Sequence, residues 1–219
     1  LTDKIDVPEL ATVPPNLRDP EGQWVALTMR ARVFYVSKER VKETAISYED
    51  LADPKWKGRL CIRSGQHPYN TGMIAAFIAH KGAAAAEAWL TAVRQNLAAR
   101  PAGGDREQVR DIHSGKCDIA VGNTYYMGVM TTNEKKPEQK EWANAVRVVF
   151  PNAADRGAHV NVSGLAIAKS APHKAEAQKL VAYLLSPEAQ SIYAGVNHEY
   201  PVVTGVAPSA LVQGWGALK

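Results

Sequence analysis

The stretch Cys117–Gly128, with the sequence CDIAVGNTYYMG, constrains the fold more than any other part of the chain. Its first half, Cys117–Val121, is short and apolar with β-branched residues, which predicts a buried strand. A glycine and an asparagine then interrupt the run, and we expect Thr124 to cap a helix that opens with Tyr125 and Tyr126. In a strand-to-helix turn beyond the carboxyl end of a parallel strand, both phenols can converge on one point. The stretch therefore predicts an oxygen-donor site suited to a hard, highly charged cation.

Adjacent tyrosines also have an ordinary structural explanation. In most such pairs one ring belongs to the core and its neighbour is half-exposed. The two interpretations differ in geometry, because only the first brings the hydroxyls of Tyr125 and Tyr126 to the same point. Features elsewhere in the sequence are needed to distinguish these two interpretations.

The two cysteines, Cys61 and Cys117, allow one disulfide. Tyr69 follows Cys61 by eight residues, and Tyr125 follows Cys117 by eight residues. If the two strands are parallel neighbours in register, the cysteines share one level and the tyrosines share another. We favour a disulfide over two free core thiols, with a contribution of about 4 kcal/mol in the chain-entropy model. A disulfide would indicate an oxidising compartment.

Charge and hydropathy argue against nucleic-acid binding and against a membrane-spanning segment. With 219 residues, 46% of them hydrophobic, the chain can form one large domain or two small ones. The net charge is +4, but lysines and arginines alternate with acids, which is typical of a solvated mixed surface. No window holds the roughly 18 apolar residues of a membrane span. We expect neither nucleic-acid binding nor a membrane-spanning segment.

The segment Trp24–Ser37 is long and rich in β-forming residues, consistent with a strand that leaves one sheet and enters another. Arg30 and Arg32 share one face of it, either exposed to solvent or turned toward an anion. Elsewhere short apolar runs alternate with helical patterns, which is typical of an α/β fold with a largely parallel sheet. The expected helices are Gly72–His80 capped by Asn70 or Thr71, Ala83–Ala98, a helix from its cap Asp105 to Ile112, Lys174–Leu185 and Pro187–Gly195.

Four motifs carry a family resemblance. They are YEDLADPKWKGRLCIRS (48–64), HPYNTG (67–72), GNTYYMG (122–128) and LVAYLLSPEAQSIYAGVNHEYPV (180–202). With them the chain resembles the periplasmic solute-binding proteins of bacterial ferric-ion ABC transporters. DLADPKWKG occurs in many binding proteins of this fold, whereas NTYY with Tyr69 placed 56 residues before Tyr125 is far more specific.

The resemblance implies a type II periplasmic binding protein fold, in which two α/β lobes joined by crossing strands close on the ligand. It assigns residues 1–31 and 158–206 to the first lobe and residues 32–157 to the second. The remaining residues, 207–219, would pack back on the second lobe. The resemblance also implies that N-terminal and C-terminal portions of the family's chain are lacking here, so that the first lobe is incomplete.

By the same resemblance, Tyr69, Tyr125 and Tyr126 are the iron ligands of the second lobe. Fe³⁺ is small, hard and triply charged, so it favours anionic oxygen. A bound cation removes phenol protons that otherwise leave near pH 10, and three phenolates neutralise three charges. Acid is expected to weaken binding, because protons compete for the ligands.

Members of this family differ in whether they use a synergistic anion such as carbonate. By position Arg30 or Arg32 is the expected anion contact, and the sequence does not choose between them. Ser64 and Asn123 are expected to orient the tyrosines from behind. His67, two residues before Tyr69, is a weaker candidate ligand, because its loop setting favours a solvent-exposed side chain over a ligand role.

The sequence is compatible with three functions. The favoured one is a monomeric, non-enzymatic protein that binds Fe³⁺ in the periplasm and delivers it to an inner-membrane ABC permease. A second keeps the fold but binds a small anion or organic solute, such as a phosphate-like compound or a polyamine. A third is a hydrolase or transferase with tyrosine or histidine as base, but the sequence contains no nucleophile–base motif to support it.

Overall fold

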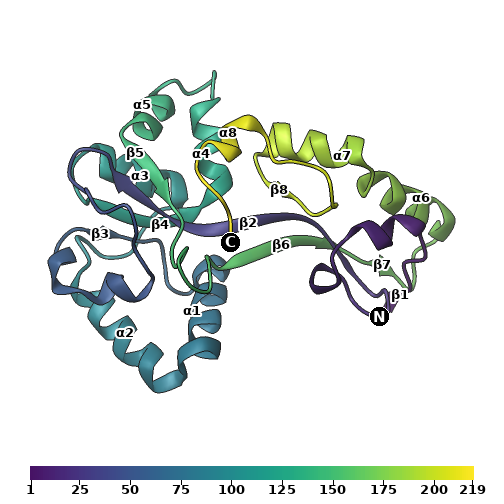
Figure 1. Ribbon diagram of the computed structural model, residues 1–219, viewed down its shortest axis with the longest axis horizontal. Coiled ribbons are helices and arrows are strands. Elements are labelled where there is room, and N and C mark those ends of the chain that lie inside the picture. The colour runs from purple at the N-terminus through teal and green to yellow at the C-terminus, as the bar shows by residue number, and fades with distance from the viewer. The chain divides into compact units, whose positions relative to one another are not determined.

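The computed structural model describes residues 1–219, which form two compact units (Figure 1). Unit 1 comprises residues 1–30 and 162–213, and unit 2 comprises residues 31–161 and 214–219. Two paired strands, β2 (Val25–Ser37) and β6 (Val160–Leu165), contribute residues to both units. The expectation that the long β2 strand enters two sheets is confirmed, because it pairs with β8 in unit 1 and with β4 and β5 in unit 2.

The sheet of unit 2 has the order β3-β4-β2-β5. Its other strands are β3 (Leu60–Cys61), β4 (Ile119–Asn123) and β5 (Val146–Val149). Only β3 and β4 are parallel along this path, whereas β2 is antiparallel to both β4 and β5. The expectation of a largely parallel sheet is therefore wrong. Strand β2 enters this sheet from unit 1 and runs between β4 and β5 in the direction opposite to both.

Side chains alternate across β2 and divide unit 2 into two layers. Phe34 and Val36 belong to a core that includes Met73, Phe77 and Trp89 from helices α1 (Pro68–Lys81) and α2 (Ala83–Gln95). Phe77 and Trp89 stack with ring centroids 4.5 Å apart. Helices α3 (Asp105–His113) and α4 (Thr124–Thr131) contact β4, and α5 (Glu138–Asn144) packs against both of these helices (Figure 1).

Unit 1 has its own small core, which includes Val25, Val181 and Leu185. Strand β1 (Thr2–Asp3) pairs with β7 (Ile167–Ala168), and β8 (Tyr200–Pro201) pairs with β2. The helices of this unit are α6 (Lys174–Leu184), α7 (Pro187–Ile192), continued by a π turn over Tyr193–Asn197, and α8 (Ala210–Gln213). Short 3₁₀ turns cover Pro8–Thr12 and Pro15–Leu17 in unit 1, and Glu49–Ala52 and Pro54–Trp56 in unit 2. No helix has the length and apolar character needed to cross a membrane.

A disulfide joins Cys61 and Cys117, with the Cα atoms 5.8 Å apart, so the predicted pairing is confirmed. The predicted register is wrong, because Cys61 lies opposite Ala120 in the β3–β4 ladder. Cys117 precedes the first residue of β4 and reaches the bridge from the turn that follows α3. A Cα separation in this range lets two cysteines bridge without being level in a sheet.

The helices that flank the tyrosines begin at other residues than expected. Helix α1 starts at Pro68 and is capped by His67, whose Nδ1 accepts from the backbone N–H of Tyr69 at 3.3 Å. Proline suits the first helical position, because its missing N–H would have no helical partner there. Asn70, an expected cap, lies inside the helix and is buried, since its side chain bonds to Arg32 instead.

The caps expected at α3 and α4 are wrong for a similar reason. Gly104 caps α3, and the carboxylate of Glu107 accepts from its N–H at 2.8 Å, while Asp105 turns inward to buried partners. Asn123 caps α4 without a side-chain bond, and the hydroxyl of Thr124 accepts from the N–H of Ala31 at 3.2 Å. In both places a tertiary hydrogen bond replaces the local capping bond.

Candidate metal centre

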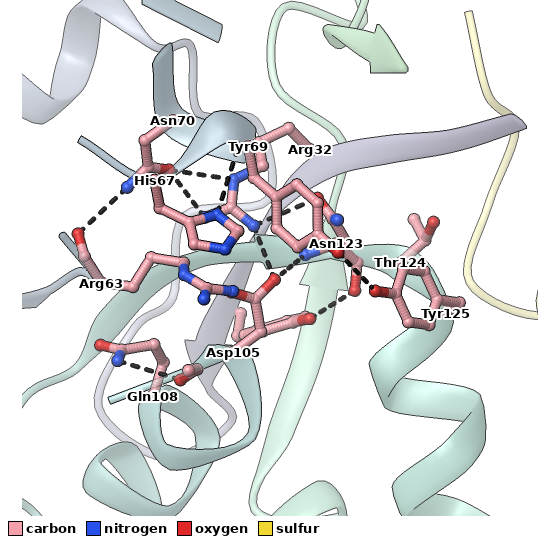
Figure 2. A network of polar contacts seen from close by, with 12 residues as sticks. Arg32, Arg63, His67, Tyr69, Asn70, Asp105, Gln108, Asn123, Thr124 and Tyr125 are labelled. Carbon is pink, nitrogen blue, oxygen red and sulfur yellow. Dashed lines mark hydrogen bonds and ion pairs between the residues drawn. The ribbon is translucent and has the colours of Figure 1, made fainter. Parts of the chain in front are cut away.

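Two tyrosines from different helices meet at the helix starts (Figure 2). Tyr69 is the second residue of α1 and Tyr125 is the second residue of α4. Their hydroxyl oxygens lie 3.2 Å apart, so one phenol can donate to the other. The convergence expected from the two strand-to-helix segments is therefore present in unit 2, even though the strand register is not the predicted one.

Tyr126 extends this pair. Its ring lies against that of Tyr125, with centroids 4.3 Å apart and an angle of 31° between the planes. All three tyrosines are half-buried, so neither member of the adjacent pair is withdrawn into the core. Burial, followed by hydrogen bonds with Tyr126 and Tyr69, raises the pKa of Tyr125 far above its ordinary value. The Tyr125 phenol therefore stays protonated at neutral pH unless a cation displaces the proton.

A buried ion pair lies behind the phenols. Arg32 is 1% exposed, and its Nη1 contacts the carboxylate of Asp105 at 2.6 Å. The same guanidinium donates to Asn70 Oδ1 at 2.7 Å and to Asn123 Oδ1 at 3.1 Å. All three of its nitrogens thus have protein partners. An anion contact through Arg32 would have to break these bonds, and Arg32 instead lies 5.7 Å from the centroid of the Tyr69 ring.

Arg30, the other expected anion contact, belongs to unit 1. Its Nη1 donates to Ser163 Oγ at 2.5 Å, and its Nε has no hydrogen-bond partner within the protein. The alternation that places Arg30 and Arg32 on one face of β2 is therefore not enough to give the two guanidinium groups the same environment.

Two further arginines, which are not among the expected site residues, flank the phenols. Arg63 lies over the ring of Tyr69 at 5.2 Å, and Arg106 lies over the ring of Tyr126 at 5.3 Å. The Nε of each is buried without a protein partner. No motif marks these positions, because they approach the tyrosines from different segments, the one before α1 and the first turn of α3.

The remaining predicted residues have structural partners. His67 caps α1, with its ring edge-on to Tyr69 at 4.4 Å between centroids. Burial and the nearby Arg63 hold the pKa of His67 below its usual value, which suits the neutral acceptor that the cap requires. Ser64 is exposed; its hydroxyl accepts from Gln66 N–H at 3.2 Å.

Phenol oxygen is the donor type that this site offers. The chain has no group of three or more histidine, cysteine, aspartate or glutamate side chains placed to hold a metal ion. The converging tyrosines would offer anionic oxygen once deprotonated, and such donors suit a hard trivalent cation better than a soft one. Polar groups that converge at helix starts, beyond the ends of strands, are typical of ligand sites in α/β proteins, so the geometry indicates a binding protein.

Comparison with known proteins agrees with that class. The chain belongs to the bacterial extracellular solute-binding protein family, whose model matches residues 1–213. It is 43% identical over 208 residues to iron uptake protein A1 of Synechocystis, covering 94% of this chain and 58% of that protein. The chain thus spans less than two thirds of the length of this relative.

Solved structures show the same fold over the whole of this chain. The Bordetella ferric binding protein matches with a TM-score of 0.93 and 52% identity, covering 100% of this chain and 69% of that one. A Trichodesmium protein (IdiA, FutA) in complex with iron and citrate matches with a TM-score of 0.94 and 39% identity, covering 100% and 70%. The fold is therefore that of the type II periplasmic binding proteins, as expected from the resemblance.

Proposed function

We propose that this protein binds Fe³⁺ through phenolate oxygens of Tyr69, Tyr125 and Tyr126. The observation that carries the proposal is the 3.2 Å separation between the hydroxyl oxygens of Tyr69 and Tyr125, which come from two different helices. Neutral phenols at that distance share one hydrogen bond. Fe³⁺ would displace the hydroxyl protons of all three tyrosines, which are released to solvent, and the three phenolates would balance its charge.

The assignment of the two units to two lobes is part of the same proposal. Residues 1–31 and 158–206 would form the first lobe, and residues 32–157 the second, which carries the tyrosines. Residues 207–219 would pack back on the second lobe; of these, residues 214–219 group with unit 2 and residues 207–213 group with unit 1.

A synergistic anion such as carbonate would occupy coordination positions that the phenols leave open. Arg30 remains a proposed contact. The engaged nitrogens of Arg32 argue against it as a donor to an anion, whereas Arg63 and Arg106 each have an Nε without a protein partner beside a tyrosine ring. A carboxylate or carbonate oxygen accepts strongly from a guanidinium group.

The whole protein is proposed to act as a monomer in the periplasm and to deliver iron to an ABC permease of the inner membrane. The family to which the chain belongs is described as extracellular, and the Cys61–Cys117 disulfide suits an oxidising compartment. The similar proteins from Synechocystis and Bordetella are named for iron uptake and ferric binding. Binding and release of an ion need no catalytic group, so no enzymatic activity is proposed.

A visible absorption spectrum tests the proposal. Adding ferric citrate to the metal-free protein should produce a tyrosinate-to-iron charge-transfer band. Tyr125→Phe and Tyr126→Phe should each remove most of it, because only the ligand oxygen is lost. Tyr183→Phe is the matched control, since Tyr183 is 47% exposed on α6 in unit 1.

A protein that stays colourless with ferric citrate would overturn the proposal. Calorimetry in metal-free buffer with phosphate, sulfate and a polyamine would then test whether the same fold takes a small anion or organic solute. Acid should weaken the band, because each proton that returns to a phenol removes one ligand from iron.

A further inference from the structure

One buried guanidinium contacts both helices that carry the converging tyrosines (Figure 2). Arg32 Nε and Nη2 donate to the side-chain oxygen of Asn70, at 3.2 and 2.7 Å, and Asn70 follows Tyr69 directly in α1. Arg32 Nη1 donates to the side-chain oxygen of Asn123, at 3.1 Å, and Asn123 is the cap of α4, two residues before Tyr125. A planar group with several fixed donors can hold two partners in one geometry.

Asp105 holds the Arg32 guanidinium in place through an ion pair. Its carboxylate accepts from Arg32 at 2.6 Å and from Arg63 at 3.0 Å, and it also accepts from the backbone N–H of Asn123 at 2.8 Å. The side chains of Arg32 and Asp105 are 1% and 0% exposed. A charge buried to this extent persists only if it is paired and hydrogen-bonded, so the arrangement admits little movement.

We propose that Arg32 and Asp105 are positioning residues that hold Tyr69 and Tyr125 at ligand spacing before any ion arrives. They act through Asn70 and Asn123 and touch no bound ion themselves. Holding ligands in place beforehand removes the cost of ordering them at the moment of binding, which is where affinity is otherwise lost. This inference depends on the proposed iron function only for its iron readout, because the spacing of the two phenols can be measured without metal.

The chain contains a matched control for the charge effect. Asp118 also bridges two arginines, Arg40 at 2.5 Å and Arg59 at 2.6 Å, but it does so just before the first residue of β4, whereas Asp105 binds the last residue of that strand. Removing either aspartate leaves two arginines without their shared carboxylate. Only the change at Asp105 removes the support behind the tyrosines.

The metal-free experiment uses ¹⁹F NMR of protein labelled with 3-fluorotyrosine. In the wild-type background Tyr125→Phe should shift the Tyr69 resonance, because the two hydroxyls are in contact. In the Asp105→Asn background that response should disappear, whereas in the Asp118→Asn background it should persist. Retention of the response in Asp105→Asn would overturn the inference.

The iron experiment separates this inference from the proposed function. If wild type binds Fe³⁺, Asp105→Asn should weaken binding by about 10- to 100-fold, as is typical for residues behind metal ligands, and move the charge-transfer band. Asp118→Asn should leave both unchanged. If the wild type shows no charge-transfer band but its ¹⁹F response depends on Asp105, the iron function is overturned and the positioning role is supported.

A second pair of variants covers a failure of Asp105→Asn to fold. Arg63 lies over the Tyr69 ring at 5.2 Å, but the response compares two spectra in the same background, so the loss of this ring contact cancels. The side chain of Arg63 is 14% exposed, and it also pairs with Asp105 at 3.0 Å. Arg63→Gln should therefore reduce the response of the Tyr69 resonance to Tyr125→Phe. Arg59→Gln, which removes the corresponding arginine from Asp118, should not. Equal responses in these two variants would contradict the positioning role.

Discussion

The two ends of β4 use the same charge motif in different surroundings. Before its first residue, Asp118 bridges two arginines whose side chains are 36% and 35% exposed. At its last residue, Asp105 bridges two arginines whose side chains are 1% and 14% exposed. The tyrosine cluster lies at this second, buried end.

The difference shows what burial adds to an ion pair. Water screens the charges at the Asp118 end, so the bridge there can rearrange at little cost. At the Asp105 end the guanidinium of Arg32 has a partner for every nitrogen, while the phenols in front of it bond chiefly to one another. The hydrogen-bonding groups of Arg32 are thus all used within the protein, whereas the phenol oxygens in front of it remain available to a ligand.

The largest expected effect is on stability at the buried end. Asp105→Ala should lower the free energy of unfolding by about 3–5 kcal/mol, because it leaves the buried charge of Arg32 without its carboxylate. Asp118→Ala should lower it by about 1 kcal/mol or less, since its arginines remain hydrated. Urea denaturation of both variants measures the difference. Similar losses at the two ends would show that burial does not distinguish them.

Removing the disulfide should act on stability without disturbing the tyrosines. The bridge between Cys61 and Cys117 spans a sequence separation of 56 residues, next to the Asp118 end of β4. Replacing both cysteines by alanine should lower the free energy of unfolding by about 4 kcal/mol if chain entropy dominates. The Tyr69 resonance should still respond to Tyr125→Phe. Loss of that response would mean that the two ends are mechanically coupled.

The smallest expected effect is on how stability depends on pH. Burial by itself would raise the pKa of Asp118, but hydrogen bonds from Arg40 and Arg59 outweigh it and hold the pKa below the ordinary value of 3.8. Asp118 therefore contributes stability above about pH 4, and this contribution is lost as the pH falls through its lowered folded-state pKa.

Asp118→Asn should flatten the decline of unfolding free energy below about pH 4, by less than about 1 kcal/mol. Denaturation midpoints measured from pH 6 to pH 3 test this. A variant that declines as steeply as wild type would assign the acid sensitivity to other carboxylates.

Local sequence was a good guide to where the tyrosines lie and a poor guide to what supports them. The strand and helix of the stretch around Tyr125 are both present, and the phenol of Tyr69 reaches the same point. The expected caps Asn70 and Asp105 both serve Arg32 instead. Capping preference is worth about 1 kcal/mol, so a buried charge that needs partners can override it.

The disulfide illustrates the same limit. Two cysteines allow one pairing, so the bridge between Cys61 and Cys117 could be predicted without the register. Their equal spacing to Tyr69 and Tyr125 suggested level positions, but the ladder places Cys61 opposite Ala120. The turn after α3 brings Cys117 within bonding distance of Cys61, and the path of that turn cannot be predicted from residue spacing.

By itself the sequence determined the types of element, the disulfide and the residues able to offer phenol oxygen, because these follow from local patterns and from the short list of suitable side chains. Only the tertiary structure decided that Arg32 lies buried behind the tyrosines and that Asp105 and Arg63 complete its surroundings. The physical reason is that the partners of a buried charge come from segments far apart in the chain, and desolvation selects them only once those segments pack together.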